Sequence, residues 1–251
     1  MQKLLEVKGL KKTFYKNKVP FVAVNNVSFD VNEGECLGLV GESGCGKSTT
    51  AKIITHLTAP DEGSVLLDGE ETLFLKGRQE RKLYQKIQMV FQTPQDSFDP
   101  RRSLGDGIME SMRNQGMLKA RAKERMYELL DMVELDREFA SRCPHQVSGG
   151  QCQRAAIARA LAPAPELIIC DEATSSLDVT VQAQIVELLK KLQKEQGLSL
   201  LLICHDLALV QKICDRVLVM YKGNIVEQGV PDEVILHPKD TYTRMLVESV
   251  F

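Results

Sequence analysis

The chain has 251 residues, of which 43% are hydrophobic and 26% are charged, and its formal net charge is −2. This composition supports a sizeable buried core, and the charge balance gives no electrostatic reason to expect nucleic acid or anionic lipid as the main partner. No run approaches the roughly 18 consecutive apolar residues of a membrane-spanning helix, and residues 1–10 carry no signal-type apolar run. We therefore expect any role at a membrane to depend on a partner protein.

The cysteines favour a reducing compartment. Their number is odd and no two are spaced as C-x-x-C, which disfavours a disulfide framework and a zinc site. They are Cys36, Cys45, Cys143, Cys152, Cys170, Cys204 and Cys214. Most are expected to be small apolar core residues. Cys45 is the exception and a candidate for alkylation, because it lies in the glycine-rich loop described below.

Strand-like and helix-like patterns follow one another along the chain. The strand patterns lie at 2–8, 22–30, 35–41, 64–68, 87–91, 166–171, 199–204, 216–221 and 224–228, and the helical patterns at 46–57, 104–132, 149–162, 178–195 and 206–212. The early strands alternate, which is typical of antiparallel strands with one face toward a core. The later strands are continuous apolar runs separated by helices, as in a parallel sheet covered on both faces. The patterns predict an α/β fold with a helical insertion that begins near residue 93.

A glycine-rich loop connects the strand-like run at 36–40 to a helix. Residues 41–48 read Gly-Glu-Ser-Gly-Cys-Gly-Lys-Ser and match G-x-x-x-x-G-K-[ST] in full. The glycines let backbone N–H groups wrap a β-phosphate, and the helix that follows directs its positive end at the anion. We expect Lys47 to bridge the β- and γ-phosphates and Ser48 to ligate Mg²⁺. The residues expected to bind the nucleotide here are Gly41, Glu42, Ser43, Gly44, Cys45, Gly46, Lys47, Ser48 and Thr49.

An apolar strand-like run ends in two carboxylates, Asp171 and Glu172. Such a strand can run beside the one that feeds the phosphate loop, which would bring Asp171 close to Mg²⁺. Glu172 then lies one residue further on, where it can orient or deprotonate the water that attacks the γ-phosphate. Loop and carboxylates together predict hydrolysis of a nucleoside triphosphate.

Residues 147–151, Val-Ser-Gly-Gly-Gln, open a helical pattern. Ser-Gly-Gly-Gln before such a helix resembles the signature motif of ABC-type ATPases. Other motifs follow in the family's order: Gln92 resembles the Q-loop glutamine, residues 175–178 resemble the D-loop with its Asp178, and His205 resembles the switch histidine. The resemblance covers essentially the whole chain.

The resemblance implies a single ABC nucleotide-binding domain over residues 1–251. Its P-loop NTPase core, a mixed sheet with an antiparallel β subdomain, is expected at 1–92 and 161–251, and its helical subdomain at 93–160. In the family, two such domains meet head-to-tail and the signature of each caps the ATP of the other. The signature residues here are Ser148, Gly149, Gly150 and Gln151. ATP binding then closes the dimer and hydrolysis releases it.

The resemblance also assigns roles at the nucleotide site. The expected catalytic residues are Lys47, Gln92, Glu172 and His205, and the expected Mg²⁺ ligands are Ser48, Gln92 and Asp171. Family members commonly stack the adenine on an aromatic residue ahead of the first long strand. Phe14 fits the spacing best and Tyr15 is the alternative, and a plain packing role for either residue stays open.

Three stretches resemble the peptide and nickel importer subfamily: residues 91–101, Pro144-His145, and the tail at 237–244. Pro94 and Pro100 would stiffen the segment that the family uses to grip a cytoplasmic helix of the permease. This resemblance implies ATP and Mg²⁺ as cofactors. The implied partners are two permease subunits, a second ATPase subunit that is usually a paralogue, and an extracytoplasmic solute-binding protein, with no nucleic acid. It also implies a peripheral location on the cytoplasmic face of the inner membrane.

Peptides and nickel or other metal chelates both remain as cargo. The end of the chain at Phe251, without the longer C-terminal extension of many peptide importers, favours a metal chelate slightly. A soluble ABC-type ATPase of DNA repair or translation is the alternative function, but those proteins typically carry two cassettes or a long coiled-coil insertion. A regulatory module without turnover is disfavoured, because Glu172 and His205 are both present.

Overall fold

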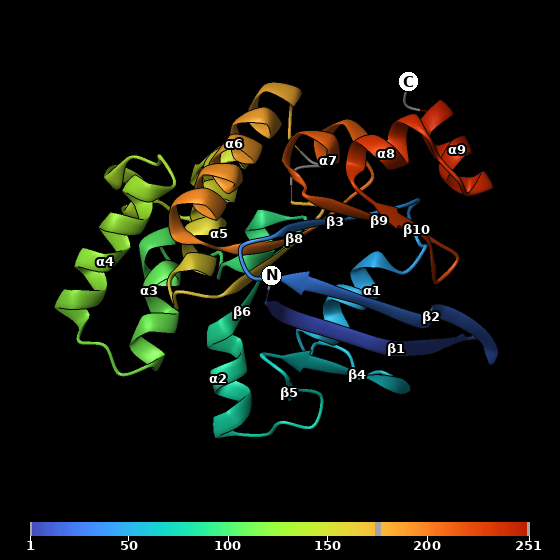
Figure 1. The fold of residues 1–251 in the computed structure, drawn as a ribbon. Helices are drawn as coiled ribbons and strands as arrows, with labels where there is room; N and C mark the ends of the chain where they lie inside the picture. Colours follow the sequence, from blue (N-terminus) through green and yellow to red (C-terminus); the bar gives the residue numbers. More distant parts are fainter. Residues whose placement is uncertain (1, 174–176, 250–251) are drawn as a thin grey trace.

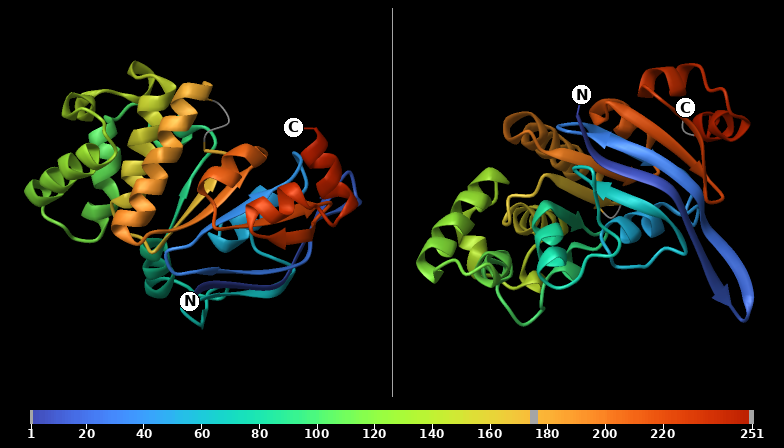
Figure 2. Two further views of the ribbon diagram at one scale, coloured as in Figure 1. Left: turned by 45° about the horizontal axis from the view of Figure 1, so that its top comes forward. Right: turned by 60° about the horizontal axis from the view of Figure 1, so that its bottom comes forward.

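The structure is a computed structural model that describes residues 2–173 and 177–249. Its described strands form two sheets (Figure 1). The smaller sheet is antiparallel in the order β2-β1-β4-β5. Its strands are β1 (Lys3–Lys16), β2 (Val19–Asn32), β4 (Glu62–Leu67) and β5 (Glu70–Glu71). Both β1 and β2 extend beyond the predicted ranges, because they continue outward as one long hairpin (Figure 2).

The larger sheet has the strand order β10-β9-β3-β8-β7-β6 and is parallel except for β10. Its strands are β3 (Cys36–Val40), β6 (Ile87–Val90), β7 (Leu167–Asp171), β8 (Ser199–Cys204), β9 (Arg216–Tyr221) and β10 (Asn224–Gly229). The predicted mixed sheet with an antiparallel companion is confirmed.

Each face of the larger sheet packs against a separate hydrophobic core. Its strands are therefore buried on both sides, which explains why they are continuous apolar runs in the sequence. Leu37 and Leu39 of β3 face the antiparallel sheet and α1 (Lys47–Ile54), whereas Cys36 and Val40 face the helices that cover the other side of the sheet. Since successive side chains of a strand point to opposite faces, all five residues of β3 are buried. The phosphate-loop helix α1 is therefore held between the two sheets.

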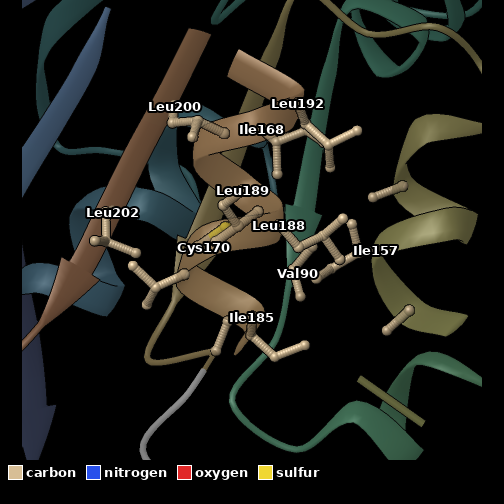
Figure 3. Close-up of a cluster of buried hydrophobic side chains, with 14 of the residues drawn as sticks. Val90, Ile157, Ile168, Cys170, Ile185, Leu188, Leu189, Leu192, Leu200 and Leu202 are labelled. Carbon is tan, nitrogen blue, oxygen red and sulfur yellow. The ribbon is translucent and has the colours of Figure 1, made fainter. Parts of the chain in front are cut away.

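Five helices cover the opposite face of the larger sheet: α5 (Gly149–Leu161), α6 (Val179–Gln196), α7 (Leu207–Ile213), α8 (Pro231–Leu236) and α9 (Thr241–Glu248). Figure 3 shows how α6 packs: Ile185, Leu188, Leu189 and Leu192 lie against β7 and β8, with Ile157 of α5 beside them. All the cysteines except Cys143 are buried, which confirms most of them as core residues.

The helical insertion contains α3 (Leu104–Asn114) and α4 (Lys119–Met132), which lie with α5 on the side of the molecule away from α8 and α9 (Figure 2). The prediction of one helix over 104–132 was wrong. The chain turns at residues 115–118, where Gly116 has a φ of 89°, a left-handed conformation that glycine adopts without steric cost. No strand occurs between residues 93 and 160, all of which are described.

Three helices were not predicted. The helix α2 (Arg78–Lys86) buries only Leu83, so it carries no apolar periodicity. The short helices α8 and α9 lie in the tail, where the sequence offered a motif and no helical pattern. None of the described helices combines the length and apolar character that crossing a bilayer requires.

Candidate nucleotide-binding site

The phosphate loop is packed tightly against two neighbouring strands. Gly46 caps α1 with a φ of 115°, and a Cβ there would lie 2.1 Å from the carbonyl oxygen of Ala23 in β2. Gly41 has a φ of 152°, and its Cβ would lie 2.1 Å from the carbonyl oxygen of Met220 in β9. Both positions exclude a side chain on conformational and steric grounds. The glycines therefore fix the loop in place as well as opening it to a ligand.

Lys47 lies inside this loop. Its side chain is only 4% exposed, and its ammonium donates hydrogen bonds to the carbonyl oxygens of Gly41 (2.6 Å) and Glu42 (2.8 Å). The first turn of α1 contains no acidic residue. A buried cation at the start of a helix creates a positive potential suited to a phosphate group.

The neighbouring Cys45 is 6% exposed. Burial raises the pKa of its thiol, although the Lys47 ammonium opposes the shift. Because the thiolate is the nucleophilic form, this environment disfavours the alkylation expected from sequence.

Ser48 and Asp171 lie together although 123 positions separate them in the chain. The Ser48 hydroxyl donates to Asp171 Oδ1 at 2.8 Å. The sequence suggested that β3, which leads into the phosphate loop, and β7, which ends at Asp171, would be neighbours. Instead β8 lies between them, but all three strands are parallel and end at the same edge of the sheet. Burial raises the pKa of Asp171, against the lowering effect of the Ser48 hydrogen bond. The Ser48 hydroxyl and the buried Asp171 carboxylate are oxygen ligands of the kind that Mg²⁺ prefers, so the pair fits this ion.

Gln92 and Glu172 form the next pair at this edge. Gln92 Nε2, two residues after β6, donates to Glu172 Oε2 at 2.9 Å. Glu172 itself has a φ of +49°, and its backbone N–H donates to the carbonyl oxygen of Ile203 at 2.9 Å. A left-handed conformation at a residue other than glycine is uncommon and is found preferentially at functional sites.

These elements line one cavity of about 330 Å³. Its lining comprises Phe14, Phe21, Ala23, Ser43, Gly44, Gly46, Lys47, Ser48, Thr49, Gln92 and Glu172. Of the two aromatic candidates, Phe14 contributes to this lining and Tyr15, which is 74% exposed, is not among the lining residues. Sequence reasoning missed Phe21, which is paired with Phe14 across the hairpin of β1 and β2. The sequence contains a hint of this pairing, because Phe14 and Phe21 lie equally far from the turn that joins the two strands.

The glycine-rich start of α5 has a different environment. Ser148 Oγ accepts from the Gln151 backbone N–H (3.3 Å), and Gln151 Oε1 accepts from the Ser148 N–H (2.9 Å), which together form a capping box. Ser148 and Gly149 are exposed and lie outside the lining of the cavity. Within one chain, the predicted signature and the phosphate loop are not brought together.

The remaining predicted residues lie near the same edge or cap a helix. Asp178 caps α6 by accepting from the Val181 N–H at 3.0 Å, while Ser175 and Ser176 fall outside the described residues. His205 follows β8, the strand between β3 and β7, and is exposed. It is not among the residues that line the cavity.

Comparison with known proteins agrees with this geometry. Residues 24–175 match the family model of the ABC transporter. The chain belongs to the ABC transporter family. It is 47% identical over 255 residues to the oligopeptide transport ATP-binding protein OppF of Bacillus subtilis strain 168, covering 99% of this chain and 83% of that protein. It is equally 47% identical to OppF of Escherichia coli K12, over 98% of this chain and 74% of that one.

Comparison with solved structures also shows that the chain has the fold of an ABC ATPase. A dimeric post-hydrolysis structure of the ATP-binding cassette MJ0796, bound to ADP and Pi, superposes with a TM-score of 0.83. It shares 32% identity and covers 91% of this chain and 99% of that one. The chain is thus an ABC-type ATPase, and the soluble ATPase of DNA repair or translation is not favoured.

Proposed function

We propose that this chain is the ATP-hydrolysing subunit of an importer for oligopeptides. The observation that carries the proposal is the arrangement of Lys47, Ser48, Gln92 and Glu172 around one cavity, with Asp171 bonded to Ser48. The cargo is inferred from relatives that are oligopeptide transport proteins, and from Brucella proteins 42% identical to the chain that bear the name of putative peptide import ATP-binding proteins. These relatives favour peptide over the metal chelate expected from the C-terminus.

The phosphate loop and Lys47 bind the β- and γ-phosphates of ATP, and Phe14 stacks on the adenine with Phe21 beside it. Ser48, Asp171 and Gln92 would hold Mg²⁺, which would offset the charge on the phosphates. Glu172 accepts a proton from the attacking water. The Gln92 amide, by donating to Glu172, keeps that carboxylate directed at the cavity. His205 contacts the γ-phosphate from the end of β8.

The signature Ser148–Gln151 serves the nucleotide of a second ATPase subunit. It is a helix start with two glycines, its Ser148 and Gly149 are exposed, and none of its four residues lines the chain's own cavity. A backbone N–H cluster of this kind binds a phosphate when another subunit presents one. ATP then closes the pair of subunits, with Asp178 near the shared interface, and hydrolysis opens it.

The domain organisation follows the same scheme. Residues 1–92 and 161–251 form the nucleotide-binding core, and residues 93–160 form the helical part that grips a cytoplasmic helix of the permease. Pro94, buried in the turn Pro94–Ser97, stiffens the link between the two. Two permease subunits, a paralogous second ATPase and an extracytoplasmic binding protein complete the importer. The chain is then peripheral to the cytoplasmic face of the inner membrane.

The test is ATPase activity of the complex, reconstituted in proteoliposomes with its permease pair and second ATPase. We expect stimulation by binding protein loaded with an oligopeptide, and no stimulation by the same protein offered nickel. The complex carrying Glu172→Gln is the control for background hydrolysis. Stimulation by nickel alone would contradict the cargo. A chain that co-purifies with no membrane subunit would contradict the transport function.

A further inference from the structure

A tyrosine of the C-terminal tail contacts the phosphate loop directly. The hydroxyl oxygen of Tyr242, in α9, accepts a hydrogen bond from the backbone N–H of Glu42 at 2.9 Å. The two residues are 200 positions apart, and Tyr242 is 7% exposed. The tail therefore supplies a partner to a peptide unit of the loop that is expected to hold ATP.

The Tyr242 ring is fixed by its surroundings. It stacks on Tyr221, at the end of β9, with ring centroids 4.0 Å apart and an interplanar angle of 22°. Asp240 caps α9 by accepting from the Tyr242 N–H at 2.8 Å. Glu227 of β10 accepts from the backbone N–H groups of Lys239 (2.9 Å) and Asp240 (3.0 Å). The stack on Tyr221, the Asp240 cap and the Glu227 carboxylate together anchor α9 on β9 and β10.

The same peptide region of the loop also holds Lys47. The Gly41 carbonyl, which shares a peptide unit with the Glu42 N–H that donates to Tyr242, accepts from the Lys47 ammonium at 2.6 Å. The Glu42 carbonyl accepts from the same ammonium at 2.8 Å. On the far side of the loop, the Gly223 N–H donates to the carbonyl oxygen of Cys45 at 2.9 Å. The loop is thus restrained from outside at Glu42 and at Cys45, and the first restraint comes from the tail.

We propose that Tyr242 is a positioning residue for ATP: its hydroxyl fixes the peptide unit between Gly41 and Glu42, and with it the Gly41 carbonyl that accepts a hydrogen bond from Lys47 inside the loop. The proposal rests on the proposed function, in which this loop binds the phosphates. A part-buried N–H that loses its acceptor is costly, and a loop that must be ordered on binding costs affinity. Loss of this one hydroxyl should therefore weaken ATP binding more than it slows the chemical step.

Tyr242→Phe tests this, with Tyr221→Phe as the matched control. Each variant keeps the stacked pair of rings and removes one hydroxyl, but only Tyr242 bonds to Glu42. In the full chain without nucleotide, we expect Tyr242→Phe to speed amide hydrogen exchange of the phosphate-loop peptide several-fold. The thermal unfolding midpoint should fall by only about 2–4 °C, the scale of one lost hydrogen bond in a chain of this size. We expect the KM for ATP to rise about five-fold with kcat changed less than about two-fold, since one hydrogen bond contributes roughly 1 kcal/mol. Tyr221→Phe should match the wild type in both readouts.

Unchanged loop exchange and KM in Tyr242→Phe would overturn the proposal, and so would equal effects in both variants, because the stack and not the hydroxyl would then be responsible. If Tyr242→Phe does not fold, Glu227→Gln loosens the anchor of α9 and should speed loop exchange in the same direction; no change there would also overturn it. The exchange measurement needs no nucleotide. A chain that fails to hydrolyse ATP would therefore refute the proposed function without deciding the role of Tyr242.

Discussion

Two glycine-rich helix starts in this molecule resemble each other in sequence and differ in environment. The loop before α1 is packed on β2 and β9, contains the buried Lys47 and opens into a cavity. The start of α5 is exposed, and its Ser148 and Gln151 satisfy each other in a capping box. The glycines of the first have positive φ angles; those of the second are ordinary helical residues.

The difference indicates what each start requires from elsewhere. The first has its cation, its proposed metal ligands and its aromatic wall within one chain, so a single subunit should bind ATP. The second offers backbone N–H groups and the Ser148 hydroxyl, so in the proposed mechanism it serves as a phosphate site when another subunit supplies a nucleotide. Variants that damage the first start should therefore weaken ATP binding by a single chain. Variants that damage the second should leave that binding intact and reduce hydrolysis by the pair of subunits.

The largest effect is expected from Glu172→Gln, which leaves both helix starts intact and removes the acceptor for the water proton. Hydrolysis should fall by about 10²- to 10⁴-fold, because general bases contribute on that scale. ATP binding should persist, so ATP-bound dimers should accumulate in size-exclusion chromatography with Mg²⁺. Unchanged turnover in this variant would show that Glu172 is not the base.

Gly46→Ala attacks the first start alone. The new Cβ would lie 2.1 Å from the carbonyl oxygen of Ala23, a backbone atom, at a φ of 115°. The strain should distort the loop and weaken ATP binding by a single chain by about 50-fold or more, as measured by calorimetry. Gly44→Ala is the control, since a Cβ there meets nothing within 4 Å and adds only the strain of a φ of +81°. Equal losses in both variants would contradict the steric argument.

Much of the phosphate loop before α1 could be predicted from sequence, because its glycines, Lys47 and Ser48 lie within eight consecutive residues, 41–48. The meeting of Ser48 with Asp171 also followed from sequence, because parallel strands end at a common edge. The intervening β8 was not predicted, since strand order is set by packing between segments far apart in the chain. The contact of Tyr242 with Glu42 spans 200 positions and leaves no local pattern.

The fold was predicted where apolar periodicity exists and missed where it does not. The buried strands β7 and β8 appeared as apolar runs, and their predicted bounds agree with the structure to within one residue. The charged helix α2, which buries only Leu83, gave no such signal. The false joining of α3 and α4 had the opposite cause: helical patterns on both sides of Gly116 concealed a turn.

Gly150→Ala attacks the second start alone. Its Cβ would lie 2.5 Å from Cγ1 of Val181, a side-chain atom of α6, and alanine favours the helix. We expect ATP affinity of the single chain to change less than about two-fold. Hydrolysis, which in the proposed mechanism needs the dimer, should fall about ten-fold because the approach to the partner's phosphate is obstructed. Loss of ATP binding by the isolated chain would break the distinction between the two starts.

The smallest effect concerns the aromatic wall of the first start. Phe14 lines the cavity beside Phe21, whereas Tyr15 is 74% exposed and does not contribute to the lining. Stacking of a base on an aromatic ring contributes about 1–3 kcal/mol, and the cavity here is open, so the lower end applies. Phe14→Ala should therefore weaken ATP binding about five-fold in calorimetry, with a smaller loss for triphosphate alone, because that ligand lacks the base. Tyr15→Ala should bind ATP as the wild type does. A larger loss of ATP binding in Tyr15→Ala than in Phe14→Ala would assign the adenine contact to Tyr15. Equal losses for ATP and triphosphate in Phe14→Ala would mean that the Phe14 ring supports the loop and does not contact the base.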